Sequence, residues 1–570
     1  MNEKGSELAV NPLSSRLPPF LGYDMTPTDI VNISRPLSEM ARLQPDTPAI
    51  IFPQKARTLT FRELDQSSNR MATGLGRIGI ERGMKTALLV PPSPELFALT
   101  FALFKVGAVP VFIDPGIGAR NMKGCLAEAE PEAFIGIPKA HLARRLLGWG
   151  RSSIRITVVV GGRAIWGGVP LTEICSQEIG DLPFAPAGTL RADPAAILFT
   201  SGSTGPPKGA VYSHGTFAAQ IDALRELYDI RPGEIDLPTF PLFALFAPAL
   251  GMTALIPQMD FTRPGSVDPR QIIGPAGQYT ATTMFGSPAL LNRVGRYAAP
   301  RNITLSHLKR VISAGAPVPA AVLERFAALL PPDAEIFTPY GATEALPVSS
   351  IGSREVLSET GAMTGEGHGV CVGRPVASIS LAIIPISDAP VAQWNNDLAL
   401  PVWEVGEIAV RGPQVSSSYL NRPEATRLAK IPDPAGGVWH RMGDLGYLDN
   451  SGRIWFCGRK AHRVQTSQGA LYTIPVEGIF NTHPAVFRTA LVGLGLKGSQ
   501  QPVLCVELEA KTAPPVQEQI RRELLELGSR YPHTRNIRQI LFHPAFPVDI
   551  RHNAKIFREK LAVWAQDKLS

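Results

Sequence analysis

Short apolar runs alternate with amphipathic stretches through the first part of the chain. The runs 87–90 (Ala-Leu-Leu-Val) and 109–113 (Val-Pro-Val-Phe-Ile) have the length and composition of buried strands. Leu64, Met71 and Leu75 recur at spacings that share one helix face, and residues 97–106 are also typical of a helix. Strands that alternate with helices pair in parallel, so the pattern predicts a doubly wound α/β sheet.

The same alternation continues from 191 to 338, where 195–199 predicts a buried strand and 216–228 a helix. From 402 to 457 the pattern changes to short strands punctuated by glycine, which predicts a small β-barrel-like subdomain. A chain of 570 residues is too long for one core. We expect βα subdomains at about 30–190 and 191–370, a β-rich subdomain at 371–458, and a small α+β C-terminal domain at 462–570.

Composition narrows the class of protein. The chain is 44% hydrophobic and 18% charged, with a net charge of +7 and no dense Lys/Arg block, so nucleic acid is not an expected partner. The five cysteines are scattered without metal-ligand spacing, which fits a reducing cytoplasm. Residues 1–17 lack the apolar core of a signal peptide.

The uncharged segment 237–259 has the length of a membrane span but not its composition. Four prolines, Pro238, Pro241, Pro248 and Pro257, argue against a continuous helix there. We therefore expect a cytoplasmic protein without a transmembrane segment, in which this stretch lines an apolar pocket.

The strand at 195–199 leads into a loop of small residues with the chemistry of an anion site. Thr200, Ser201, Ser203 and Thr204 supply hydroxyls, Gly202 and Gly205 allow tight turns, and Lys208 supplies a positive charge. Lys208 lies three residues after Gly205, and Gly209 replaces the hydroxyl residue that would follow the lysine in a P-loop. The pattern excludes a P-loop NTPase and leaves a flexible Ser/Gly linker as the alternative.

The stretch 198–209 (Leu-Phe-Thr-Ser-Gly-Ser-Thr-Gly-Pro-Pro-Lys-Gly) resembles the phosphate loop of the adenylate-forming superfamily, which includes acyl-CoA synthetases, peptide-synthetase adenylation domains and luciferases. A second motif, 337–344 (Phe-Thr-Pro-Tyr-Gly-Ala-Thr-Glu), resembles the same superfamily. In it Tyr340 offers a ring face to adenine, Thr343 a hydroxyl to phosphate and Glu344 a carboxylate to Mg²⁺. A helix entry capped by Thr343 is the alternative for this motif.

Further segments match the superfamily in its own order. The turn 311–317 is similar to its adenine-binding segment, Asp444 to its ribose-binding aspartate and Arg459 to its arginine near ribose and phosphate. The segment 457–461 is similar to the hinge, with Ala461 at the pivot, which implies an N-terminal domain at 1–458, a hinge at 459–461 and a mobile C-terminal lid. Lys555 matches the catalytic lysine of the last loop, although Asn553 and Ala554 replace the usual Ser-Gly.

The resemblance therefore implies a set of site residues. Lys555, Lys208 and Thr343 are the expected catalytic residues, and Glu344 is the expected metal ligand. The expected ATP- and AMP-binding residues are Thr200, Ser201, Gly202, Ser203, Thr204, Gly205, Lys208, Ser313, Gly315, Ala316, Pro317, Tyr340, Gly341, Ala342, Thr343, Glu344, Asp444 and Arg459.

The implied reaction joins ATP, with Mg²⁺, to a carboxylate and yields an acyl-adenylate and pyrophosphate. The segments 112–121, 241–248 and 552–555 also resemble the bacterial olefin β-lactone synthetases of long-chain hydrocarbon biosynthesis. That resemblance implies a long-chain 2-alkyl-3-hydroxy acid whose 3-hydroxyl closes a β-lactone, and it allows assembly with other enzymes of that pathway.

The acyl pocket is expected at Phe243, Ala244 and Phe246, where Ala244 replaces a histidine common in the superfamily. A long-chain fatty acyl-CoA ligase is the first alternative function. A degenerate nucleotide-binding module is the second, and the presence of Lys208, Glu344, Asp444 and Lys555 argues against it.

Overall fold

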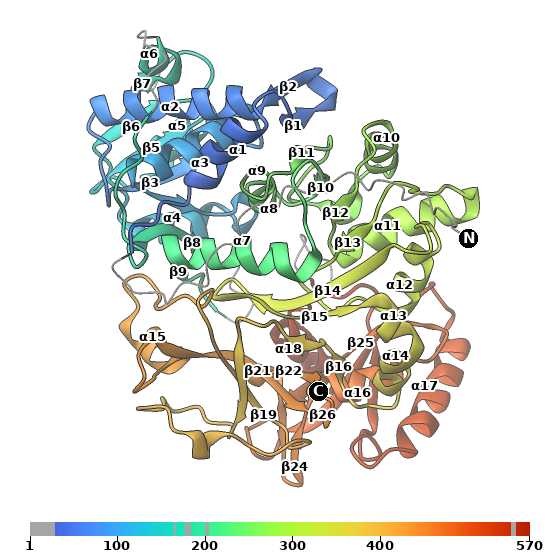
Figure 1. Cartoon of the computed structure of the whole chain (residues 1–570). Coiled ribbons are helices and arrows are strands. Elements are labelled where there is room, and N and C mark those ends of the chain that lie inside the picture. Colours follow the sequence, from blue (N-terminus) through green and yellow to red (C-terminus); the bar gives the residue numbers. More distant parts are fainter. Residues whose placement is uncertain (1–28, 165–166, 177–183, 200–204, 549–554) are drawn as a thin grey trace, which may run out of the picture.

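The computed structural model describes residues 29–164, 167–176, 184–199, 205–548 and 555–570. Two large sheets with their helices form the upper part of Figure 1, and a β-rich subdomain and the C-terminal domain lie below them. The strand predicted at 195–199 and the motif at 337–344 both lie near the centre of this arrangement.

The first sheet has seven strands in the order β7-β6-β5-β3-β4-β8-β9, parallel except for the last pair. Its strands are β3 (Lys85–Leu89), β4 (Val109–Phe112), β5 (Ala133–Gly136), β6 (Ile156–Val159), β7 (Val169–Pro170), β8 (Pro194–Phe199) and β9 (Gly209–Ser213). Its helices are α1 (Arg35–Leu43), α2 (Phe61–Arg77), α3 (Pro94–Val106), α4 (Ala119–Ala129), α5 (Pro138–Leu147) and α6 (Leu171–Cys175). The doubly wound parallel sheet predicted from the sequence is confirmed.

Local signals explain where these helices begin and end. Thr60 and Glu63 form a capping box at the start of α2, and Leu64, Met71 and Leu75 are all buried, as their spacing predicts. Helix α3 ends at Gly107, which adopts the left-handed conformation that closes a helix.

The second sheet has nine strands in the order β17-β15-β14-β13-β12-β10-β11-β1-β2. Its strands are β1 (Pro48–Phe52), β2 (Arg57–Thr60), β10 (Ile235–Pro238), β11 (Thr253–Leu255), β12 (Thr283–Phe285), β13 (Arg310–Ile312), β14 (Glu335–Ala342), β15 (Ala345–Gly352) and β17 (Arg374–Pro375). Its helices are α7 (His214–Tyr228), α8 (Pro241–Ala244), α9 (Phe246–Ala249), α10 (Arg270–Gln278), α11 (Pro288–Ala298), α12 (Ala320–Ala327), α13 (Ser353–Glu355) and α14 (Gly361–Gly365).

The two large sheets exchange strands across the expected boundary at 190/191. Strands β1 and β2 join the second sheet, whereas β8 and β9 join the first. A single cut in the sequence therefore does not separate the two βα subdomains, because strand pairing joins segments that are distant in the chain.

The uncharged stretch 237–259 is broken into the short elements β10, α8, α9 and β11, as its prolines predict. Within the described residues, no helix combines the length and the apolar character needed to cross a membrane.

The β-rich subdomain is an open sheet. Its strand order is β16-β22-β21-β19-β18, with β20 paired to β21, so the expected barrel is not closed in the described residues. The elements are β16 (Val370–Cys371), β18 (Ser380–Ile384), β19 (Gly406–Arg411), α15 (Pro423–Ala429), β20 (Lys430–Pro432), β21 (Val438–Leu448) and β22 (Ile454–Arg459). Periodicity reports which face of a strand is buried, and edge-to-edge closure leaves no such signal in the sequence.

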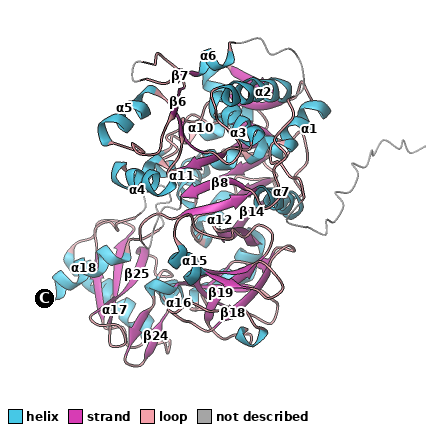
Figure 2. Cartoon of the chain, turned by 90° about the vertical axis from the view of Figure 1, so that its left-hand side faces the viewer, coloured by secondary structure: helices cyan, strands magenta, loops and turns pink. Residues whose placement is uncertain are grey.

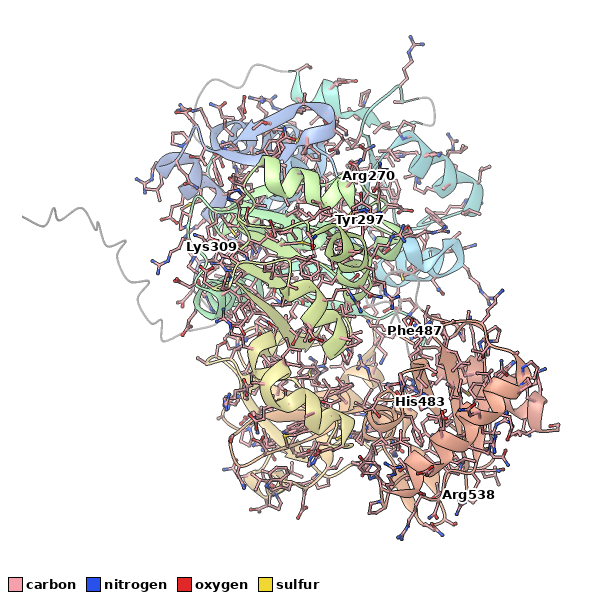
Figure 3. The ribbon with its side chains drawn as sticks, turned by 90° about the vertical axis from the view of Figure 1, so that its right-hand side faces the viewer. Arg270, Tyr297, Lys309, His483, Phe487 and Arg538 are labelled. Carbon is pink, nitrogen blue, oxygen red and sulfur yellow. The ribbon has the colours of Figure 1, made fainter. Side chains whose placement is uncertain are left out.

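The C-terminal domain packs against the lower side of the molecule (Figure 2). Its three-stranded sheet has the order β25-β26-β27, and β23 and β24 form a separate hairpin. Its elements are β23 (Val464–Thr466), β24 (Gly469–Leu471), α16 (Thr473–Phe480), β25 (Val486–Leu494), β26 (Gln501–Leu508), α17 (Pro514–Ser529), β27 (Gln539–Phe542) and α18 (Arg558–Leu569). Helix α16 contacts both α14 and β22, and Figure 3 shows Phe487 on the side of this domain nearest the N-terminal domain.

Candidate active site

A cavity of about 2300 Å³ lies where the two large sheets, the β-rich subdomain and the C-terminal domain meet. It brings together sequence-predicted residues from seven separate segments: Gly205, Lys208, Phe243, Phe246, Gly315, Ala316, Pro317, Tyr340, Gly341, Ala342, Thr343, Glu344, Asp444, Arg459 and Lys555. Residues 200–204 lie outside the described residues.

Two of the expected site residues do not line this cavity. Ala244 is only 1% exposed, and its side chain packs in the core beneath α8 instead of on the pocket wall. Ser313 is also buried, and its backbone N–H donates to Phe337 O within the sheet. In each case an adjacent residue lines the cavity instead: Phe243 beside Ala244 in helix α8, and Ala314 after Ser313.

Tyr340, Asp444 and Arg459 form a buried polar group on one side of the cavity. The Tyr340 hydroxyl donates to Asp444 Oδ2 at 2.7 Å, and Arg459 Nη1 lies 3.0 Å from Asp444 Oδ1. Burial raises the pKa of Asp444, and Arg459, Tyr340 and Lys555 oppose that rise by favouring the charged carboxylate. Asp444 Oδ1 is buried without a well-aligned hydrogen bond, so it is suited to accept one from a ligand hydroxyl.

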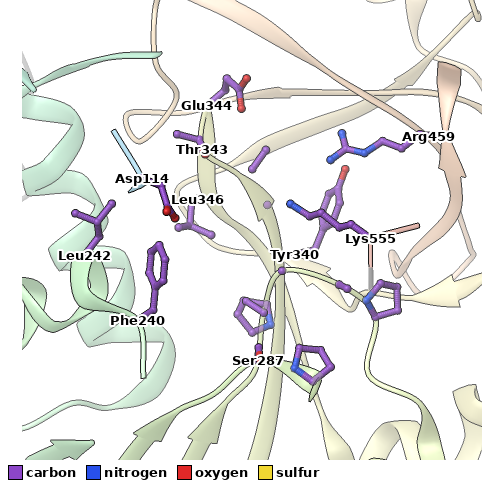
Figure 4. A pocket seen from close by; sticks show the side chains of 18 of the residues that line it. Asp114, Phe240, Leu242, Ser287, Tyr340, Thr343, Glu344, Leu346, Arg459 and Lys555 are labelled. Carbon is purple, nitrogen blue, oxygen red and sulfur yellow. The ribbon is translucent and has the colours of Figure 1, made fainter. Parts of the chain in front are cut away.

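The motif at 340–344 ends a strand and does not begin a helix. Thr343 and Glu344 form the turn between β14 and β15, which excludes the helix-entry alternative. The Thr343 carbonyl accepts a hydrogen bond from the Tyr212 hydroxyl, and the Glu344 carbonyl accepts one from Ser416 N at 2.8 Å. Both contacts hold this tight turn in place beside the cavity (Figure 4).

Glu344 and Lys208 both contact Tyr419, a residue that belongs to none of the motifs recognised in the sequence. The Tyr419 hydroxyl donates to Glu344 Oε1 at 2.5 Å, and Lys208 Nζ lies 5.1 Å from the centre of the Tyr419 ring. Tyr419 reaches this place because its loop pairs with β9: Leu420 N donates to Gly209 O and Val211 N to Ser418 O. Sequence reasoning missed Tyr419 because this pairing joins segments about 200 residues apart.

Behind this group lies a second polar pair that sequence reasoning also missed. Lys430 is 4% exposed, and its ammonium donates to the Ser416 carbonyl and hydroxyl oxygens. Burial lowers the pKa of Lys430 to about 7, while the nearby Glu344 carboxylate favours the charged amine. His440 is buried next to it, and burial together with the Lys430 charge holds the pKa of His440 well below its usual range.

Lys555 enters the cavity from the C-terminal domain and lies beside Tyr340 and below Arg459 in Figure 4. Its segment is anchored by Arg558, whose guanidinium makes a two-pronged ion pair with Glu477 at 2.5 and 2.9 Å. Glu477 also accepts a hydrogen bond from Leu491 N, so the pair joins α16, β25 and the start of α18. This buried pair fixes the chain at Arg558, three residues after Lys555.

The part of the cavity beside Thr343 has an aromatic wall. Phe240, Phe243 and Phe285 form an edge-to-face aromatic cluster, with Phe243 and Phe285 centred 4.5 Å apart. Phe240 and Leu242 point into the cavity in Figure 4, close to Asp114 at the end of β4. An apolar arm therefore begins within reach of the polar site.

A family model for AMP-binding enzymes matches residues 37–420. The chain belongs to the AMP-binding enzyme family. Its members form adenylates from ATP, so the chain is an ATP-dependent, AMP-forming ligase, and the resemblance inferred from the motifs is confirmed.

Two curated relatives cover nearly the whole chain. The olefin β-lactone synthetase of Xanthomonas campestris pv. campestris is 51% identical over 551 residues, which are 94% of this chain and 98% of that protein. The olefin β-lactone synthetase of Stenotrophomonas maltophilia is 50% identical over 554 residues, with the same coverage.

A solved structure confirms the fold. The o-succinylbenzoate coenzyme A synthetase of Bacillus subtilis, in complex with ATP and magnesium ion, has a TM-score of 0.73 at 20% identity and covers 92% of this chain and 98% of that one.

Proposed function

We infer that this chain activates a long-chain 2-alkyl-3-hydroxyalkanoic acid with ATP and closes the resulting adenylate to a β-lactone. The carboxylate oxygen attacks the α-phosphorus of ATP, and pyrophosphate leaves. The 3-hydroxyl oxygen then bonds to the acyl carbon, the bond from that carbon to the AMP oxygen breaks, and the hydroxyl proton is released. Two relatives at half identity over nearly their whole length carry the name of this activity, which supports the proposal.

The observation that carries the proposal is the meeting of Lys555, Glu344 and Asp444 in one cavity that continues into an apolar arm. Asp444 would accept the ribose hydroxyls, and Tyr340 and 315–317 would face adenine. Lys555 and Lys208 would neutralise charge on the phosphate and carboxylate oxygens, and Thr343 would donate to phosphate. Such a site acts by positioning and charge neutralisation, and closure by the C-terminal domain excludes the water that would hydrolyse the adenylate.

Glu344 is the residue that would hold Mg²⁺ together with phosphate oxygens. Its carboxylate is an oxygen ligand of the kind this cation prefers, and Tyr419 fixes its orientation. When bound, the cation neutralises charge on the phosphates. Glu344→Gln should weaken the Mg²⁺ dependence of adenylate formation more than nucleotide binding; a Mg²⁺ titration that overlays the wild type would assign the metal to another residue.

The hinge of the proposed C-terminal lid would lie at Ala461. The two residues before it are anchored on the β-rich subdomain, Arg459 through Asp444 and Lys460 through Glu407 at 3.0 Å, whereas Ala461 is exposed. Limited proteolysis should cut near this segment and release a C-terminal fragment, with ATP and acid protecting it. Cleavage only elsewhere, unchanged by ligands, would count against a hinge here.

The deciding experiment is one incubation of the purified protein with ATP, Mg²⁺ and a synthetic 2-alkyl-3-hydroxy acid, with and without coenzyme A. Stoichiometric AMP and a dehydrated cyclic product without coenzyme A, read by NMR and mass spectrometry, would support the lactone. A thioester that forms only with coenzyme A would make the chain an acyl-CoA ligase. If neither product forms, the chain would be a nucleotide-binding module without this activity.

A further inference from the structure

The first sheet has a topological switch point that opens into the cavity. Strand β3 lies between β4 and β5, and the chain leaves β3 and β5 in opposite directions along the sheet. Ala87 packs in the cluster that contains α4, and its neighbour Leu88 packs in the cluster that contains α3, so these helices cover opposite faces. In open α/β sheets, ligands bind in the crevice at the carboxyl ends of the strands at such a point.

The residues at this crevice line the cavity, and nearly all of them are apolar. The end of β3 and the loop after it contribute Leu89, Val90, Pro91 and Pro92, and the segment after β5 contributes Ile137, Ala140 and Ala143. Met122 of α4 and Trp149 complete the wall, and Lys139 is exposed at its margin. We call this part of the cavity, lined by 89–92, 122, 137, 140, 143 and 149, the switch-point arm.

The switch-point arm is lined by the first sheet and its connections, whereas the aromatic arm at Phe240, Phe243 and Phe285 is lined by the second sheet and its short helices. The two meet at the end of β4, where Ile113 and Asp114 line the cavity and Asp114 lies close to Leu242 in Figure 4. The total volume of about 2300 Å³ is more than twice the upper end of the roughly 300–1,000 Å³ of ordinary small-molecule sites. A cavity of this size leaves room for more than one long chain beside the polar site.

We propose that the switch-point arm binds one of the two hydrocarbon chains of the substrate, while the aromatic arm binds the other. The proposal rests on the proposed function, because only an acid branched at carbon 2 carries two long chains that diverge next to its carboxylate. Two chains that diverge at the reacting centre need two apolar arms that meet there, and burial of each methylene favours binding. The arms meet beside Asp114 and Thr343, where that centre would lie.

Ala140→Phe tests the proposal by filling the switch-point arm, with Ala143→Phe as a second filling variant. Leu146→Phe is the matched control, because Leu146 lies on the same helix, α5, but is exposed and does not line the cavity. AMP release is measured with three acids: one with two long chains, one shortened at carbon 2 and one shortened at the carbon-3 chain. Thermal unfolding confirms that each variant is folded.

The filling variants should lower kcat/KM at least tenfold for the acid with two long chains. The filling variants should use one of the shortened acids, the one that lacks the chain held in this arm, as efficiently as the wild type does. The control should match the wild type on all three acids. Equal losses on both shortened acids, or no loss on the long one in either folded variant, would overturn the proposal.

Two other outcomes separate this proposal from the proposed function. If the wild type releases no AMP from any of the three acids, the proposed function fails and the assignment of the arm falls with it. If coenzyme A raises the wild-type rate and Ala140→Phe abolishes that rise, the arm belongs to coenzyme A and the chain assignment is wrong.

Discussion

The Tyr419 hydroxyl donates a hydrogen bond of 2.5 Å to Glu344 Oε1, and the ring of the same tyrosine lies beneath the Lys208 ammonium. Burial and the adjacent carboxylate raise the pKa of Tyr419, so its hydroxyl keeps its proton near neutral pH. One side chain therefore orients the proposed metal ligand and contacts the proposed phosphate-binding lysine.

Tyr419→Phe should raise the Mg²⁺ concentration needed for half-maximal ATP–pyrophosphate exchange by about tenfold or more, in the range typical of residues that orient metal ligands. The ring and its contact with Lys208 remain, so the loss isolates the hydrogen bond. Tyr228→Phe is a matched control, since its buried hydroxyl bonds to Ser350 away from the cavity wall. An identical Mg²⁺ requirement in Tyr419→Phe and wild type would show that Glu344 is oriented without this bond.

Lys430→Met should change how the free energy of unfolding depends on pH. Because burial lowers the pKa of Lys430 to about 7, the unfolded chain binds one more proton at this residue between about pH 7 and pH 10. Wild-type stability therefore rises with pH in that window, by at most about 1.4 kcal/mol per pH unit from this group, and the variant lacks the rise. Urea unfolding measured at pH 6 and pH 9 should show that the wild type gains stability relative to Lys430→Met at the higher pH. If the two proteins show parallel pH profiles, Lys430 does not titrate in this window.

Lys555→Ala should lower ATP–pyrophosphate exchange by about 10²–10³-fold, the usual cost of removing one group that neutralises charge in the transition state. Its thermal stability should remain within about 1 kcal/mol of the wild type, because the side chain lies in a cavity and not in a core. Lys560→Ala serves as the control: Lys560 belongs to the same part of the chain but is exposed and packs on Phe557. Exchange at the wild-type rate in Lys555→Ala would remove this residue from the adenylation step.

Gly478→Ala should weaken docking of the C-terminal domain. Gly478 lies in α16, and a Cβ there would overlap the Thr364 carbonyl oxygen of α14 in the other domain. We expect exchange to fall about tenfold or more, because a small displacement of Lys555 is costly. Alanine is the better helix former, so α16 itself is not weakened.

Gly274→Ala, in helix α10, is the matched control for Gly478→Ala, because a Cβ at Gly274 meets no neighbouring atom. Full exchange activity in Gly478→Ala would show that this helix contact is not part of the active arrangement.

Much of the candidate site is readable from local sequence. The buried strand before Lys208, the helix with Leu64, Met71 and Leu75 on one face, and the proline-broken stretch 237–259 all report local backbone preferences and are present in the structure. Lys208, Lys555, Glu344 and Asp444 were found because each lies in a motif that resembles the superfamily and has a residue type suited to the expected chemistry.

What the sequence alone determined is thus the α/β class, most elements and the side chains that carry charge to the site. Only the tertiary structure decided that β1 and β2 join the second sheet, that Ala244 faces the core, and that the β-rich sheet remains open in the described residues. It also placed Tyr419 on Glu344 and Tyr340 on Asp444, 75 and 104 residues apart in the chain. Periodicity records which face of an element is buried, whereas the identity of the element that covers that face depends on packing between distant segments, and no local pattern encodes it.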